Sequence, residues 1–174
     1  MMEEEFAKFL EEYAEYLKSK PPLIDIPLSP KELLAEASRI RAKSRVKLEG
    51  GKIVIYLDNG KTEHWAHLEG EIIITFDKLY RPLKVEIEIK DTMDSEKVLK
   101  NLKNEKISDI EFLIDDGFIE IYLAKGDAEH WAHLEGEIIM ALDESYKPLR
   151  LEIEIKDTMD SEKVLKNAGL LSSS

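Results

Sequence analysis

An internal repeat is the feature that most constrains this chain. The nine residues from Glu63 to Glu71 (EHWAHLEGE) recur unchanged from Glu129 to Glu137. Residues 46–101 align on 112–167 without a gap, and about two thirds of the aligned positions are identical. A unit of this length buries only about 60% of the surface of its unfolded chain when it stands alone. We therefore expect the two copies to share a core and to pack with pseudo-two-fold symmetry.

Alternating apolar positions predict strands within each copy. Asn59-Gly60 is typical of a two-residue hairpin turn, because both central positions of such a turn need a positive φ. The expected elements of the first copy are strands over 53–57, 62–68, 72–76 and 83–89, tight turns at 59–60 and 69–70, and a short helix capped by Asp94. Each copy is thus predicted to be a four-stranded antiparallel β-meander followed by a helix.

Two helices are predicted ahead of the repeats. The second begins at Pro30, with Ser29 as its N-cap and Glu32 positioned to complete a capping box. The first covers residues 3–19, and apolar side chains at three- and four-residue spacing line one of its sides: Phe6, Phe9, Leu10, Tyr13, Tyr16 and Leu17. This side either packs on the sheet or the second helix, or forms an arm that binds a groove of a partner protein.

The sequence therefore predicts an α+β protein in three parts. An N-terminal helical arm covers residues 1–45, the first β-meander and helix repeat covers 46–106, and the second covers 107–174.

Composition excludes several classes of function. The chain contains no cysteine, which excludes disulfides, thiolate zinc sites and cysteine nucleophiles. Its formal net charge of -12 disfavours nucleic acid and anionic membranes as partners and favours a basic protein. One local basic run stands out, and we interpret it as an intramolecular or interchain complement to the acidic surface: Arg39, Arg41, Lys43, Arg45 and Lys47.

The same composition bears on the protein's environment. No signal peptide or membrane span is recognisable, so we expect a soluble cytoplasmic protein. The charged content of 36%, rich in Glu and Lys, is typical of thermophile proteins.

All histidines and tryptophans lie in the repeated segment, and imidazole is a common metal ligand. His64 and His67 point to opposite faces of a strand, so one copy cannot chelate a metal with both. The remaining metal hypothesis joins both copies across the pseudo-two-fold axis, with four ligands: His67, His133, Glu69 and Glu135.

The alternative is that this segment is a packing or recognition face. Alternation directs His64, Ala66 and Leu68 toward the core and leaves Trp65 and His67 outside. The predicted outer face carries the same four residues in each copy: Tyr56, Trp65, His67 and Ile73, then Tyr122, Trp131, His133 and Ile139. Such an apolar face should be covered by the other copy, by the N-terminal helices, by another subunit or by a partner.

No catalytic constellation is recognisable, so we expect a protein that is not an enzyme and needs no cofactor. The paired carboxylates Glu86 and Glu88, repeated as Glu152 and Glu154, lie on the wet face of a strand. Asp77 and Asp143 suit local turn bonding, and Ser95 and Ser161 suit helix capping.

The repeat resembles the domain-of-unknown-function 2283 family. The resemblance is carried by Ile53 to Leu57, Gly70 to Asp77 and Pro82 to Ile89, and in the second copy by Tyr122, Asp143 and Ile153 to Ile155. Where that family tends to have a glycine after the strand-ending Asp, this chain has Tyr80 and Tyr146. The resemblance implies two tandem copies of a small intracellular unit without an assigned activity, of a kind suspected in toxin–antitoxin-like gene pairs.

The function predicted from these features is a non-enzymatic protein-interaction module, an antitoxin-like acidic binder of a basic partner. A metal-binding protein and a self-assembling structural protein, in which homo-oligomers form, are the alternatives.

Overall fold

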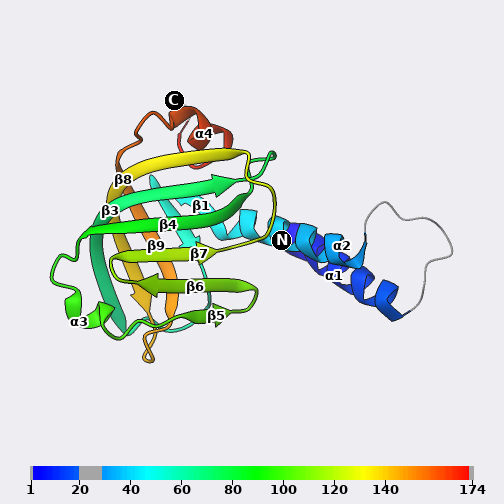
Figure 1. The fold of residues 1–174 in the computed structure, drawn as a ribbon, viewed down its shortest axis with the longest axis horizontal. Helices are drawn as coiled ribbons and strands as arrows, with labels where there is room; N and C mark the ends of the chain where they lie inside the picture. The colour runs from blue at the N-terminus through cyan, green and yellow to red at the C-terminus, as the bar shows by residue number, and fades with distance from the viewer. Residues whose placement is uncertain (1, 20–28, 173–174) are drawn as a thin grey trace.

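The computed structural model describes residues 2–19 and 29–172, which form a helical hairpin standing off a curled sheet (Figure 1). The helices are α1 (Met2–Ser19), α2 (Pro30–Arg45), α3 (Glu96–Leu99) and α4 (Glu162–Asn167). Within these described ranges, no helix is both long and apolar enough to cross a membrane.

A single antiparallel sheet of nine strands makes up the body, in the order β1-β2-β9-β8-β3-β4-β7-β6-β5. The strands are β1 (Val46–Glu49), β2 (Lys52–Tyr56), β3 (His64–Phe76), β4 (Pro82–Asp91), β5 (Glu105–Ile107), β6 (Ile110–Asp115), β7 (Phe118–Tyr122), β8 (His130–Leu142) and β9 (Pro148–Asp157). The predicted α+β class is confirmed.

The predicted meanders are not what the sheet contains, because β2 pairs with β9 and β7 pairs with β4. Strands from the two sequence copies therefore alternate in pairs across one sheet. The registers of the two exchanged pairings correspond: Ile53 lies opposite Ile153, and Ile119 lies opposite Ile87. Periodicity along the chain could not reveal this exchange, since it reports which face a residue occupies and not which strand lies beside it.

The middle of the sheet is the long pairing of β3 with β8, in which Gly70 lies opposite Gly136. The turn predicted at 69–70 is wrong, because β3 runs through Gly70 without a break for 13 residues. Gly70 is required for another reason: a Cβ there would overlap the backbone carbonyl oxygen of Glu88 on β4. This close approach coincides with a register irregularity between β3 and β4.

The hairpin turn predicted at Asn59-Gly60 is also wrong. That segment joins β2 to β3, which are not neighbours in the sheet, so no tight turn is needed there. The actual hairpin turn after β1 uses Gly50 and Gly51, whose φ values are 58° and 78°. Two consecutive positive φ angles are the requirement of a type I′ turn.

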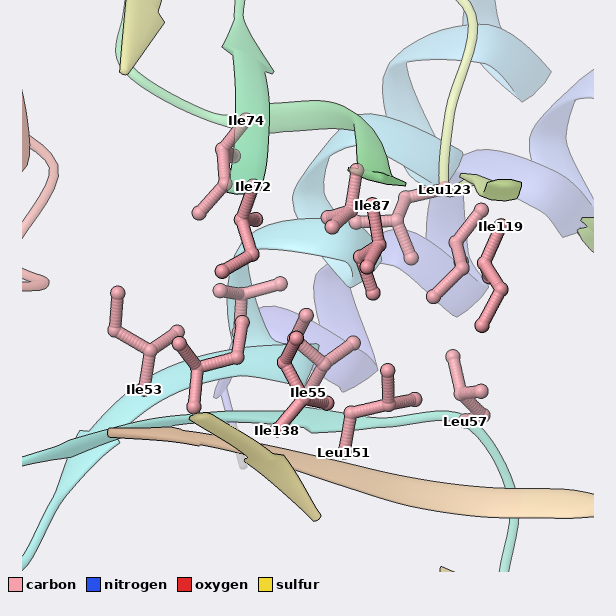
Figure 2. Close-up of a cluster of buried hydrophobic side chains, with 14 of the residues drawn as sticks. Ile53, Ile55, Leu57, Ile72, Ile74, Ile87, Ile119, Leu123, Ile138 and Leu151 are labelled. Atoms are coloured by element: carbon pink, nitrogen blue, oxygen red, sulfur yellow. The ribbon is translucent and has the colours of Figure 1, made fainter. Parts of the chain in front are cut away.

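One core fills the inside of the curl. Figure 2 shows side chains of β3, β4 and β7, such as Ile72 and Ile87, facing those of β2, β8 and β9, such as Ile53 and Leu151. The helix α2 packs on β1, β2 and β4, and its Ala42 is buried in this core. Arg45, at the end of α2, pairs with Asp109 in the turn between β5 and β6 at 3.0 Å.

The helical hairpin has a small core of its own. Ser29 caps α2, accepting a hydrogen bond from the Glu32 amide at 3.2 Å, as the sequence predicted. Apolar residues of α1 pack on α2 in a cluster separate from that of the sheet: Ala7, Leu10, Ala14, Leu33 and Ala37. Three of these five are alanines, so the two helices approach closely but bury little apolar surface.

Gly70→Ala should destabilise the protein, because its new methyl group has to displace the backbone of β4. Overpacking of this kind costs about 1–3 kcal/mol, which would lower the midpoint of urea unfolding. Gly60→Ala is the matched control, since its Cβ would meet the side chain of Leu149 and no backbone atom, and it should cost about 0.5 kcal/mol or less. Equal losses in the two variants would contradict the tight β3–β4 contact.

Candidate functional site

The outer face of the sheet carries the repeated tryptophans. Along β3 and β8, Ala66 and Leu68 are fully buried, whereas Trp65 and Trp131 are 51% and 56% exposed. The predicted division of the repeated segment into an inner and an outer side is therefore confirmed. The apolar outer face was expected to be covered. Within the described chain the N-terminal hairpin does not cover Trp65 and Trp131, because it packs elsewhere.

Each tryptophan begins a row of aromatic and cationic side chains that crosses neighbouring strands. The first row starts at Trp65 on β3 and continues through Ala141 on β8 and Arg150 on β9 to Tyr56 on β2. The Arg150 guanidinium lies 5.8 Å from the Trp65 ring centre. The second row runs from Trp131 through Thr75 and Lys84 to Tyr122. Lys84 Nζ lies 4.8 Å from the Tyr122 ring centre.

An acidic belt separates the two rows. We use this name for six outer-face carboxylates on β3, β8, β4 and β9: Glu69, Glu71, Glu135, Glu137, Glu88 and Glu154. Lys90 pairs with Glu88 at 3.0 Å, and Lys156 lies 3.3 Å from Glu137 and 3.7 Å from Glu69. Two lysines do not neutralise six carboxylates, so the belt keeps a net negative charge at pH 7.

The four predicted metal ligands are not brought together. His67 lies opposite Ile139, and His133 lies opposite Ile73, six residues farther along β3. At about 3.3 Å per residue, the two histidines are roughly 20 Å apart. Each instead has a glutamate of the paired strand near its Nε2, Glu137 at 3.9 Å and Glu71 at 3.7 Å. Across the described residues, no group of three or more histidine and acidic side chains could hold a metal ion.

The other two histidines form contacts that sequence reasoning missed. His64 stacks on Tyr146 and His130 stacks on Tyr80, each with ring centres 4.1 Å apart. Both tyrosines have a positive φ, 60° at Tyr80 and 64° at Tyr146, in the place where the resembled family tends to have glycine. Each stack joins the two copies. The signal available in the sequence was that both the histidine and the tyrosine recur at the same place in the two copies.

The turn residues have local roles. Asp77 accepts hydrogen bonds from the amides of Leu79 and Arg81 at 3.0 and 2.9 Å, as predicted for a turn aspartate. Ser95 precedes α3 but does not cap it; its Oγ accepts a hydrogen bond from the His67 amide at 2.8 Å. Ser161 binds the His133 amide in the same way. These serines attach the short helices to the central strands.

The helix α1 presents a second apolar surface, which we call the aromatic stripe: Phe6, Phe9, Tyr13 and Tyr16. Phe6, Phe9 and Tyr16 are 53%, 58% and 55% exposed, and successive rings from Phe9 to Tyr16 stack. Leu10 of the predicted partner arm is buried against α2 instead, and the side chain of Leu17 lies outside the part that the structure describes. One side of α1 therefore packs against α2, and the side that carries the aromatic stripe is exposed.

Ion pairs fix α1 on α2. Arg41 binds both carboxylate oxygens of Glu11 at 2.7 Å and Glu4 at 2.8 Å. The hydrogen bonds from Arg41 hold the pKa of Glu11 below its usual value of 4.5. Arg39 pairs with Glu36 at 3.2 Å, so the predicted intramolecular role of the basic run is confirmed for its arginines.

Comparisons with protein-family models, with curated proteins and with solved structures found no match for this chain. The resemblance to the domain-of-unknown-function 2283 family stays a prediction.

His64→Ala should lower the free energy of unfolding by about 1 kcal/mol, the usual worth of an aromatic pair. His67→Ala is the comparison, because His67 lies on the same strand and stacks on no ring among the described residues; it should change stability by about 0.5 kcal/mol or less. Thermal or urea unfolding of the two variants measures the difference. The same small loss in both would show that the stacks contribute little.

Acid should loosen α1 from α2. Because the pKa of Glu11 is lower in the folded than in the unfolded chain, its pairing stabilises the hairpin fully above a pH of about 4.5. That stability is lost as the pH falls through the folded-state pKa. Hydrogen exchange of the α1 amides, corrected for intrinsic rates, should show protection falling below about pH 4.5 while the strands stay protected.

Arg41→Gln provides the control for the acid experiment. This variant should already show weak α1 protection at neutral pH, with little further change on acidification. A pH dependence equal to that of the wild type would assign the effect to groups other than the Arg41–Glu11 pair.

Proposed function

We propose that this protein is a non-enzymatic interaction module whose outer sheet face binds a basic protein partner. The observation that carries the proposal is the exposure of Trp65 and Trp131 by more than half on the two central strands. Tryptophan is the residue type most enriched at the energetic centres of protein interfaces. The tryptophans lie on strands, which hold them in place. Binding a partner would therefore cost little conformational entropy in this face of the protein.

The acidic belt supports a basic partner. Its six carboxylates lie between the two tryptophan rows, where they would face the middle of any protein that spans both. Complementary charge speeds association and excludes acidic competitors. This chemistry suits the antitoxin-like role suggested by the family resemblance, in which an acidic protein masks a basic one.

A catalytic role is less well supported by this geometry. Glu86 and Glu88 are 40% and 43% exposed on the outer side of the curl. General acid–base catalysis favours groups in a concave site that excludes water. The metal-binding alternative would need separate sites at His67 and His133, each of which has one glutamate within 4.0 Å in the part of the chain that the structure describes.

A pull-down from the native host tests the proposal, with retained proteins identified by mass spectrometry. The wild type should retain a basic protein that Trp65→Ser/Trp131→Ser loses, and the complex should weaken with added salt. Phe9→Ser is the matched control, since it removes a ring of similar exposure from α1 and should leave the partner bound. A partner held equally by all three proteins, or one that is acidic, would refute the proposed face.

A further inference from the structure

A groove between α2 and the sheet has chemistry opposite to the rest of the surface. It has a volume of about 510 Å³ and an apolar floor that includes Leu34, Ala35 and Ala124. Three lysines line it, Lys31 on α2, Lys106 on β5 and Lys125 just past β7. This volume falls within the range of roughly 300–1,000 Å³ that is usual for binding clefts.

The three lysines of the groove outnumber its two acidic residues. Within the described chain, none of the three forms an ion pair. Of the two acidic residues that also line the groove, Asp109 is already engaged by Arg45 at 3.0 Å and by the Ser38 hydroxyl at 3.1 Å. Glu111 is the other, and it lies opposite Lys106 in the pairing of β5 with β6. The groove is therefore net positive on a chain whose formal charge is -12.

The aromatic stripe of α1 has the complementary character. Glu5 and Glu12 lie three or four residues from Phe9 along the helix, so they border the stripe on one side. Neither glutamate forms an ion pair with any residue that the structure describes. Phe6 and Phe9 are each more than half exposed beside them.

The stripe cannot enter the groove of its own chain. It lies on α1, and α1 packs on the side of α2 that carries Leu33 and Ala37. The groove opens on another side of α2, the one that carries Leu34, Ala35 and Ser38. A second molecule has to supply the helix that fills the groove.

We propose that α1 of one copy docks in the groove of a second copy, with its aromatic stripe on the apolar floor and Glu5 and Glu12 toward the lysines. The contact is reciprocal, since each copy offers both a stripe and a groove, and a two-fold dimer satisfies both at once. Each α1 then lies between its own α2 and that of the partner, as in a four-helix bundle. This self-association uses neither Trp65 nor Trp131, but Tyr122, at the end of the second tryptophan row, also lines the groove.

Sedimentation velocity over a range of concentrations tests this proposal, with circular dichroism as the check on folding. The wild type should dimerise, and so should Trp65→Ser/Trp131→Ser. An arm variant, Phe6→Ser/Phe9→Ser, and a groove variant, Lys106→Glu/Lys125→Glu, should each raise the dimer dissociation constant by about tenfold or more. Lys97→Glu/Lys163→Glu makes the same change of charge on exposed sites of α3 and α4, and should stay dimeric.

Mixing the two variants gives the sharper result. The groove variant keeps its stripe and the arm variant keeps its groove, so the mixture should form heterodimers through one intact contact, more tightly than either variant alone. A wild type that is monomeric at every concentration would overturn the proposal. The aromatic stripe would then be a binding surface for a different protein. A groove variant that dimerises like its control, or a mixture no tighter than its components, would also overturn it.

Discussion

The pairing of β3 with β8 is the contact on which the rest of the fold depends. These two 13-residue strands lie antiparallel with Gly70 opposite Gly136. Each long strand directs alternate side chains into the core and outward, so the pairing fixes both faces of the sheet. The glycines allow the neighbouring strands β4 and β9 to approach closely at the centre, because a methyl group there would overlap a backbone carbonyl.

The exchange of outer strands between the two copies follows from the pairing of β3 with β8. With β3 and β8 paired, β4 and β9 become their outer neighbours, and the hairpins that contain β2 and β7 complete the opposite halves of the sheet. Neither copy then has a core that it could keep alone, since Ile53 packs among residues of the second copy and Ile119 among residues of the first. The His64–Tyr146 and Tyr80–His130 stacks add two further links between the copies.

Curvature and charge then separate two surfaces with different uses. The outer side of the curl presents Trp65 and Trp131 on either side of an acidic belt, which suits a basic protein. The helical hairpin presents an acidic aromatic helix and, behind it, a lysine-lined groove, which suit each other in a second copy. A dimer made through the hairpins would cover Tyr122 at the end of the second row and leave Trp65 and Trp131 of both copies accessible, so one assembly could engage two partner molecules.

Local patterns in the sequence determined the two long helices, the cap at Ser29, the turn role of Asp77 and the side of the strand on which each residue from His64 to Leu68 lies. These follow from neighbours a few positions away, through helix and strand periodicity and turn chemistry. Tertiary structure alone decided that Gly70 lies within a strand, that β2 pairs with β9, that Ser95 binds the His67 amide and that His67 and His133 are far apart. Each of these depends on which distant segments become neighbours, and a face pattern of period two is satisfied equally well by a meander and by an exchanged sheet.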